Sequence, residues 1–108
     1  MAFVKYHNLV GATRQDNVLI EAQSGVNNIK SILFTNIHDS NAATISLDLV
    51  QADGASSFSI LKSISIPAGI SFLLDDKGVL NFDNTSSLGF GLQCTIGSSD
   101  TVDVLINI

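Results

Sequence analysis

Residues 88–108 read LGFGLQCTIGSSDTVDVLINI, and every second position in each half of this stretch is apolar. The first half, residues 88–96, is the longest strict alternation in the chain, and the second half predicts a strand over Thr101–Asn107. A period of two residues indicates a β-strand with one face toward a core. We expect Asp103 and Asn107 to point outward. The expected inward-facing residues of the second strand are Val102, Val104 and Ile106.

Upstream of this stretch, short alternating segments are separated by turns rich in Gly, Asp, Asn and Ser. They predict further strands at residues 17–22, 29–37, 44–50, 58–66, 70–74 and 79–82. Seven or eight strands with this spacing predict an all-β fold, a single-domain antiparallel β-sandwich of the jelly-roll or immunoglobulin-like type. We expect the sandwich to occupy residues 17–108, because no linker or internal repeat divides them.

Local departures from simple alternation carry further information. Strand 29–37 has apolar side chains on both faces, which predicts a central strand whose outer face is partly covered. In strand 58–66 the apolar residues change sides near Leu61, which predicts a β-bulge or a bend. Gly89 and Gly91 interrupt the last alternating stretch and would permit either the close approach of another backbone or a sharp coil of the sheet.

Two turns are specified by their residues. The dipeptide Asp53-Gly54 favours a hairpin between the strands on either side of it. Pro67 and Gly69 stand where the second and fourth residues of a type I turn would be, which predicts such a turn after residue 66.

Residues 1–16 differ from the rest of the chain, because their apolar residues have only a weak helical spacing and no clear cap. We interpret them as an N-terminal arm, which either packs back on the sandwich or docks on a neighbouring molecule. The predicted contact residues are the apolar side chains of this arm, namely Phe3, Val4, Tyr6, Leu9 and Val10.

Composition limits the partners. Charged residues make up only 14% of the 108 residues, which suggests that a partner covers part of the surface. The net charge is −5 and the five basic residues are scattered, whereas a nucleic-acid binder needs clustered cations. We therefore expect no nucleic-acid or membrane partner. The apolar runs are too short to span a bilayer and a secretion signal is lacking, which predicts synthesis in a cytoplasm.

The residue types typical of catalysis are sparse. His38 stands beside Asp39 in a predicted turn, but the chain lacks a Gly-x-Ser-x-Gly elbow and an evident oxyanion site. Cys94 has no second cysteine to pair with and is expected to be a buried, inert thiol. We expect neither enzymatic activity nor a cofactor.

Two binding functions were weighed against this background. A cluster of oxygen ligands suggests calcium, but its spacing does not fit an EF-hand and turn chemistry explains these residue types, so no metal is predicted. The cluster consists of Asp75, Asp76, Asn81 and Asp83. A carbohydrate-binding module is a rival function for a β-sandwich, but Trp is absent and the six phenylalanines, Phe58 included, are expected in the core. The sequon at Asn84 is interpreted as a plain loop.

Residues 18–108 resemble small β-sandwich domains of tailed-phage virion proteins. The resemblance rests on residues 29–36 (IKSILFTN), 42–47 (AATISL), 64–74 (ISIPAGISFLL) and 102–106 (VDVLI). The chain has Thr85-Ser86-Ser87 where that pattern usually has Gly-Asp before the penultimate strand. The resemblance implies a head-decoration, neck or tail-fibre component and transfers no site residues.

These observations lead to one functional expectation. The chain is expected to be a non-enzymatic structural protein of a bacteriophage virion, synthesised in the host cytoplasm, and most simply a capsid decoration protein. Its expected partners are itself, as a homo-oligomer such as a trimer, and a protein of the larger viral particle. The alternatives are a tail-fibre or neck component, or a small carbohydrate-binding module.

Overall fold

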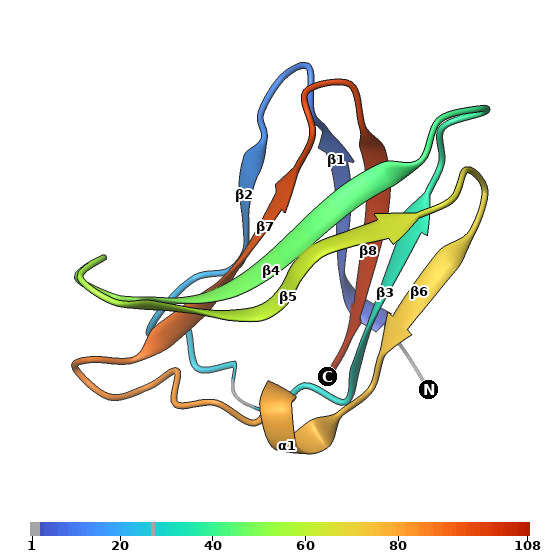
Figure 1. Ribbon diagram of the computed structural model, residues 1–108. Coiled ribbons are helices and arrows are strands. Elements are labelled where there is room, and N and C mark those ends of the chain that lie inside the picture. Colours follow the sequence, from blue (N-terminus) through green and yellow to red (C-terminus); the bar gives the residue numbers. More distant parts are fainter. Residues whose placement is uncertain (1–2, 27) are drawn as a thin grey trace.

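The computed structural model describes residues 3–26 and 28–108, which form two four-stranded antiparallel sheets packed face to face (Figure 1). The predicted all-β, single-domain sandwich is confirmed. Within the described residues the elements are β1 (Phe3–Val10), β2 (Asp16–Ile20), β3 (Ser31–Asn36), β4 (Ala43–Gln51), β5 (Ser57–Ile66), β6 (Ser71–Leu74), α1 (Lys77–Leu80), β7 (Phe90–Ile96) and β8 (Thr101–Asn107).

Most strands that lie side by side in a sheet are distant in the sequence. The first sheet has the order β1-β8-β3-β6 and the second has the order β2-β7-β4-β5. Strands β4 and β5 form the predicted hairpin, in which Gly54 adopts a φ of 73°. The β7 and β8 strands, which follow each other in the sequence, belong to different sheets.

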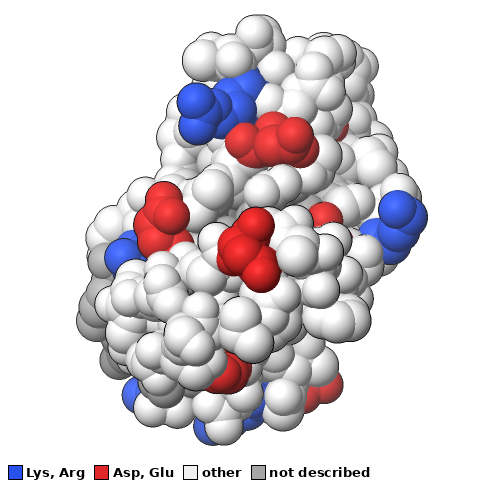
Figure 2. Space-filling model, turned by 90° about the vertical axis from the view of Figure 1, so that its left-hand side faces the viewer, with Lys and Arg blue, Asp and Glu red and all other residues white. Residues whose placement is uncertain are grey.

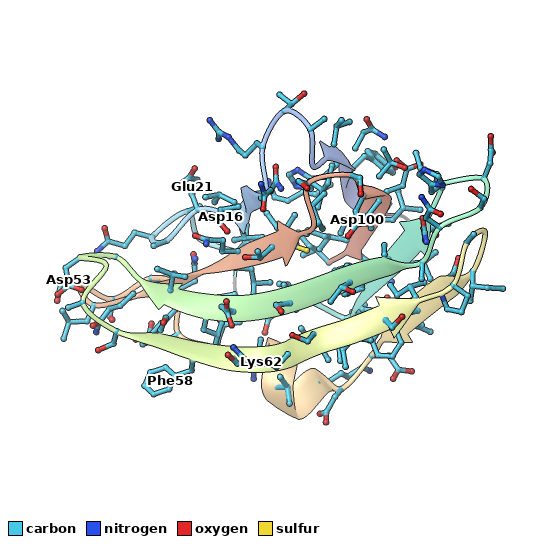
Figure 3. The ribbon with its side chains drawn as sticks, turned by 45° about the horizontal axis from the view of Figure 1, so that its top comes forward. Asp16, Glu21, Asp53, Phe58, Lys62 and Asp100 are labelled. Atoms are coloured by element: carbon cyan, nitrogen blue, oxygen red, sulfur yellow. The ribbon has the colours of Figure 1, made fainter. Side chains whose placement is uncertain are left out.

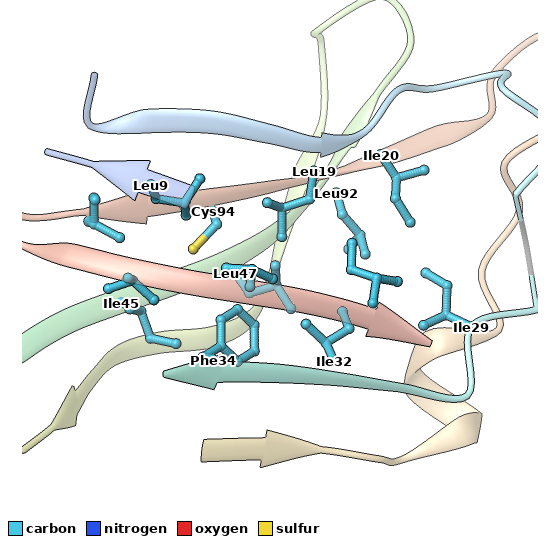
Figure 4. Close-up of a cluster of buried hydrophobic side chains, with 14 of the residues drawn as sticks. Leu9, Leu19, Ile20, Ile29, Ile32, Phe34, Ile45, Leu47, Leu92 and Cys94 are labelled. Atoms are coloured by element: carbon cyan, nitrogen blue, oxygen red, sulfur yellow. The ribbon is translucent and has the colours of Figure 1, made fainter. Parts of the chain in front are cut away.

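The core lies between the sheets and consists of the alternate apolar residues of the strands (Figure 4). Val102, Val104 and Ile106 of β8 are fully buried, as predicted. Cys94 is buried in the same layer. Since these side chains come from both sheets, their burial is the main force that holds the sandwich together.

The predicted bulge near Leu61 is confirmed. Leu47 of β4 pairs with Leu61, but the register between β4 and β5 shifts on both sides of this pair. One of the extra residues, Ser63, adopts a φ of 52°, and its N–H donates to Ser46 Oγ at 2.9 Å. These irregularities let β5 keep apolar residues on the core side although its simple alternation breaks.

Of the two alternatives for Gly89 and Gly91, the close approach of another backbone is the one observed. A Cβ at Gly91 would collide with the carbonyl oxygen of Ile20, and one at Gly89 would collide with the backbone of Asn84. The two glycines therefore let the chain segments around β2 and before β7 pack directly against β7.

Of the two alternatives for residues 1–16, packing against the sandwich is the one observed in the described part, although the segment is a strand of the sandwich and not a separate arm. Phe3–Val10 forms β1, an edge strand that pairs antiparallel with β8 from Phe3 to Val10. Gly11 then donates its N–H to Asp100 O at 2.8 Å, which ties the following turn to the turn before β8. The weak periodicity of this segment misled the prediction because an edge strand needs few inward apolar residues.

A helical turn replaces the strand predicted at residues 79–82. Asp76 caps it, since its carboxylate accepts hydrogen bonds from the N–H groups of Gly78 (3.0 Å) and Val79 (3.3 Å). Side-chain capping of this kind favours a helix start over an extended chain. Only Leu80 of the helical turn is buried.

The turn after β5 lies one residue later than predicted. Ile70 donates its N–H to Pro67 O at 3.1 Å, so Pro67 is the first residue of the turn. Gly69 is the third residue and has a φ of 73°, which is the signature of a type II turn and not of type I.

Two burial predictions are also wrong. Asn107 was expected outward, but it is buried because β8 is a central strand and Asn107 is paired with Phe3 on one side and Ser31 on the other. Phe58 was expected in the core, but its side chain is 60% exposed. It lies near the tip of the β4–β5 hairpin, which extends beyond the body of the sandwich (Figure 1).

Three buried polar side chains, Asn36, Asn84 and Asp100, fasten the loops. Asn36 Nδ2 donates to Asn41 O at 2.8 Å and to Ile66 O at 2.9 Å. Asp100 Oδ2 accepts from the N–H groups of Thr44 (3.1 Å) and Gly97 (2.9 Å). These contacts link segments that are distant in the sequence, and the structural roles of Asn36 and Asp100 were not predicted.

Candidate interaction surface

Strand β1 places the predicted contact residues along one edge of the first sheet. Tyr6 is 68% exposed, Val10 is half-buried, and Leu9 is only 4% exposed and belongs to the core. The side chains of Phe3 and Val4 lie outside the described part of the structure. Leu9 is therefore unavailable to a partner, whereas Tyr6 and Val10 stay predicted contact residues.

Tyr6 belongs to an apolar row that crosses the whole outer face of the first sheet. Tyr6 pairs with Leu105 of β8, Leu105 pairs with Leu33 of β3, and Leu33 pairs with Leu73 of β6. Directly opposed residues in a sheet have Cβ atoms about 5 Å apart, so the four side chains are contiguous. Tyr6 and Leu73 are exposed, and Leu33 and Leu105 between them are half-buried. We call these four residues the apolar row.

A polar row runs beside the apolar row, one step of alternation away. Asn8 Nδ2 donates to Asp103 Oδ1 at 2.6 Å, and the hydroxyls of Thr35 and Ser71 are hydrogen-bonded at 2.8 Å. The residues of the polar row come from β1, β8, β3 and β6, like those of the apolar row, because Asp103 of β8 pairs with both Asn8 of β1 and Thr35 of β3. The polar groups of this row therefore already satisfy one another in pairs.

The sequence analysis missed three of the four residues of the apolar row. Only Tyr6 was among the predicted contact residues. Leu33 was visible as one of the apolar side chains on both faces of strand 29–37, which predicted a partly covered outer face. Leu73 and Leu105 gave no separate signal, because their alignment with Leu33 depends on the pairing of β6 and β8 with β3.

The outer face of the second sheet has a different character. Its strands present mainly hydroxyl and amide side chains, among them Thr44, Ser46, Ser59, Ser65, Gln93 and Thr95. Thr95 Oγ1 donates to Asp16 Oδ1 at 2.9 Å. The side view in Figure 2 shows acidic and basic side chains as isolated patches on a mostly uncharged surface. This face is therefore well suited to water, whereas the first sheet exposes apolar area.

An aromatic pair, in which Phe58 is exposed and Phe90 is half-buried, lies at one end of the second sheet. The rings of Phe58 and Phe90 are 5.9 Å apart between centroids and inclined at 55°. Figure 3 shows the Phe58 ring directed away from the β4–β5 ribbon. An exposed ring of this kind offers a flat apolar surface to a ligand.

Two of the four residues of the calcium hypothesis, Asp76 and Asp83, accept hydrogen bonds from the backbone. Asp76 caps α1, and Asp83 accepts from the N–H groups of Thr85 (3.3 Å) and Ser86 (3.2 Å) and from Ser86 Oγ (2.6 Å). These hydrogen bonds lower the pKa of Asp83 below its usual value. Within the described residues, no three His, Cys, Asp or Glu side chains come together as a metal site would require.

The side chains considered for catalysis are occupied in other ways. His38 Nδ1 accepts from the N–H groups of Ser40 (3.1 Å) and Asn41 (3.0 Å) and so shapes the turn after β3. Burial raises the pKa of Cys94 to about 12, and the nearby charge of Asp48 adds to this effect. The thiol is therefore protonated at neutral pH and buried, as the sequence predicted.

His7 lies on the inner side of β1, at the border between the two sheets. Its Nε2 is buried and has no hydrogen-bond partner among the described residues. Burial lowers the pKa of His7 below 6.5, the backbone of Leu19 acts in the opposite direction, and the positive charge of Lys5 lowers it further. The folded protein thus disfavours the charged imidazolium.

Three hollows of the described surface lie at or below the lower end of the size range of ligand pockets. One of about 140 Å³ lies over Gly91 between Val18 and Val50, one of about 270 Å³ lies beside Lys30 and Lys77, and one of about 320 Å³ lies beside Val10 and Arg14. Small-molecule sites usually occupy about 300–1,000 Å³ and have converging polar groups. The longest helix in the described part of the chain has four residues, too few to cross a membrane.

The geometry thus offers two surfaces for binding, the apolar row and the aromatic pair. Comparison of this chain with models of protein families and with curated proteins found no match.

Proposed function

We propose that this protein is a non-catalytic structural protein of a bacteriophage virion, which assembles with copies of itself and attaches to a larger particle as a decoration protein. The observation that carries the proposal is the apolar row, which spans four strands and has exposed side chains at both ends and half-buried ones between them. Continuous exposed apolar area on a small protein marks a contact surface. The sequence resemblance suggests the virion as the setting.

The absence of a recognisable reactive centre in the described residues supports a binding role. The sole cysteine is buried and its pKa is raised to about 12, and the carboxylates around α1 are engaged with backbone N–H groups. Screening with ester and glycoside substrates tests this part of the proposal, since turnover of either class would contradict a non-catalytic role.

The attachment itself can be tested with particles of the source virus that were assembled without this protein. Purified protein is added back and the bound fraction is measured by co-sedimentation. We expect saturable binding at a defined number of copies per particle. A complete lack of binding to heads, tails and intact particles would overturn the proposal, and immunogold labelling of the particles distinguishes head decoration from a neck or tail-fibre position.

A carbohydrate-binding module is the second candidate function, and the Phe58–Phe90 pair, of which Phe58 is exposed, favours it. Sugars stack on exposed aromatic rings, so this function predicts hits on a glycan array that are lost in Phe58→Ala. Leu88→Ala is the matched control, because Leu88 is also an exposed apolar residue. An array without hits for the wild-type protein would exclude this candidate.

A further inference from the structure

We propose that the outer face of the first sheet is a homotypic interface, on which a second copy of this chain docks through the same apolar row. The inference deepens the proposed function, because it names the surface and the partner of the expected self-assembly. It rests on the continuity of the row, on the distribution of charge and on the available area.

The geometry of the row suits a two-fold interface. Tyr6, Leu105, Leu33 and Leu73 are aligned by direct pairing across β1, β8, β3 and β6. When two such faces meet about a two-fold axis, the row of one copy lies on the row of the other, and the self-paired polar row can remain at the margin. An isologous contact of this kind requires only one self-complementary patch.

The charge distribution favours a second copy over other partners. The chain carries a net charge of −5, so two copies repel each other through most orientations. On the outer face of the first sheet, however, the described strand positions include a single charged side chain, Asp103, and its carboxylate is hydrogen-bonded to Asn8. Two copies can therefore associate through this face without bringing unpaired like charges together. A basic partner would find almost no negative charge on this face to bind.

The other exposed apolar residues do not form a comparable surface. Val18 lies near Val50 on the second sheet, and Phe58 lies near a hairpin tip. Ile37 directly follows β3 and Ile70 directly precedes β6, while Val79 lies in α1 and Leu88 in the segment before β7. Among the described residues, only the first sheet aligns apolar side chains from four adjacent strands, of which Tyr6 and Leu73 are exposed and Leu33 and Leu105 are half-buried.

The area of the outer face of the first sheet indicates how tightly two copies should associate. Four strands about 4.8 Å apart and some six residues long cover roughly 400 Å² on each copy, or about 800 Å² in total. This is at the small end of specific interfaces, where association is weak. We therefore expect a dimer that forms with rising protein concentration, and a multivalent particle would reinforce such a weak contact.

Sedimentation velocity across about 1 μM to 1 mM protein tests the inference, a range chosen because small interfaces give weak dissociation constants. We expect the wild-type protein to self-associate and Leu73→Ser to weaken the association at least about tenfold. Leu88→Ser is the matched control, because Leu88 is 55% exposed and Leu73 is 53% exposed. A wild-type protein that stays monomeric, or two variants that associate equally well, would overturn the inference.

Two further measurements keep the test independent of misfolding. Thr35→Lys places a charge on the face without removing any apolar side chain, and it should also weaken association while its melting temperature shows that it is folded. Amide NMR signals followed on dilution should shift on the outward residues of β1, β8, β3 and β6. Shifts confined to β2 and β5 would contradict the proposal.

The outcomes separate this inference from the proposed function. Self-association through the row without attachment to particles would leave the interface standing and remove the virion role. Attachment of a strictly monomeric protein would preserve the virion role and refute the homotypic interface.

Discussion

Asn84 shows how much one buried amide can organise in this protein. Its Oδ1 accepts from the N–H groups of Gly25 (2.6 Å) and Val26 (3.0 Å), and its Nδ2 donates to Glu21 O and Phe90 O, both at 2.9 Å. All four hydrogen-bonding positions of the amide are thus used. The buried, doubly donating Nδ2 also agrees with interpreting the sequon as a plain loop.

We expect Asn84→Ala to lower the free energy of unfolding by roughly 3 kcal/mol, because it leaves buried backbone groups without partners. At about 4–8 °C per kcal/mol for a domain of this size, the melting temperature should fall by more than 10 °C. Calorimetry measures the change. Asn81→Ala is the control, since Asn81 is exposed, and similar losses in both variants would show that the four hydrogen bonds contribute little.

His7 makes stability depend on pH. Its folded pKa lies below 6.5 because of burial, so the unfolded chain binds a proton more readily than the folded chain. The free energy of unfolding is therefore expected to be highest when the imidazole is neutral in both states, and to fall as the pH drops through 6.5 toward the folded pKa.

Urea unfolding at several pH values between about 5 and 7.5 should show this decrease, and His7→Leu should remove most of it. His38→Gln removes the other imidazole of the chain, from the turn after β3, and should keep the wild-type slope. An unchanged slope in His7→Leu would show that other groups cause the pH dependence.

At the scale of elements, β1 is an integral part of the sandwich. It pairs with β8 along its length, contributes Leu9 to the core and carries Tyr6 on the outer face. An arm that only docks on a neighbour would be dispensable for folding, whereas an edge strand covers the hydrogen-bonding groups of the strand beside it.

Deletion of residues 1–8 should therefore destabilise the domain. We expect the melting temperature to fall by roughly 10 °C or more. The loss of an edge strand should lower the free energy of unfolding by several kcal/mol, and each kcal/mol corresponds to about 4–8 °C in melting temperature. Circular dichroism measures the melt, and hydrogen exchange should report lost protection in β8. A nearly unchanged melt would restore the interpretation of this segment as an independent arm.

At the scale of the whole molecule, the two outer faces differ in character although the same core joins them. The first sheet presents the apolar row, and the second presents hydroxyl, amide and a few charged side chains. This asymmetry is what the proposed homotypic interface requires, because only one of the two faces exposes aligned apolar side chains.

Calcium should have no effect on the stability of the whole domain. Since Asp76 and Asp83 accept backbone hydrogen bonds, we expect the melting temperature to change by less than about 1 °C when excess calcium is replaced by a chelator. Differential scanning fluorimetry is sufficient for this comparison. A saturable rise with calcium would reveal a metal site.

Much of the architecture could be predicted from the chain alone, because alternation is a local property. The alternation around Cys94 and Val104 predicted that both segments are strands and which of their side chains face the core. The change of sides near Leu61 predicted the position of the bulge. The helical turn at Lys77–Leu80 was not predicted, because capping by Asp76 outweighed a short extended pattern.

The sequence by itself determined that this is a β-sandwich and which side chains of β7 and β8 fill its core, since both follow from the period of two along each strand. Only the tertiary structure decided that β1 closes one edge against β8, and that Tyr6, Leu105, Leu33 and Leu73 form one surface. The physical reason is that register between strands is set by long-range hydrogen bonding and packing. Neighbours across a sheet can therefore be distant in the chain and leave no local pattern.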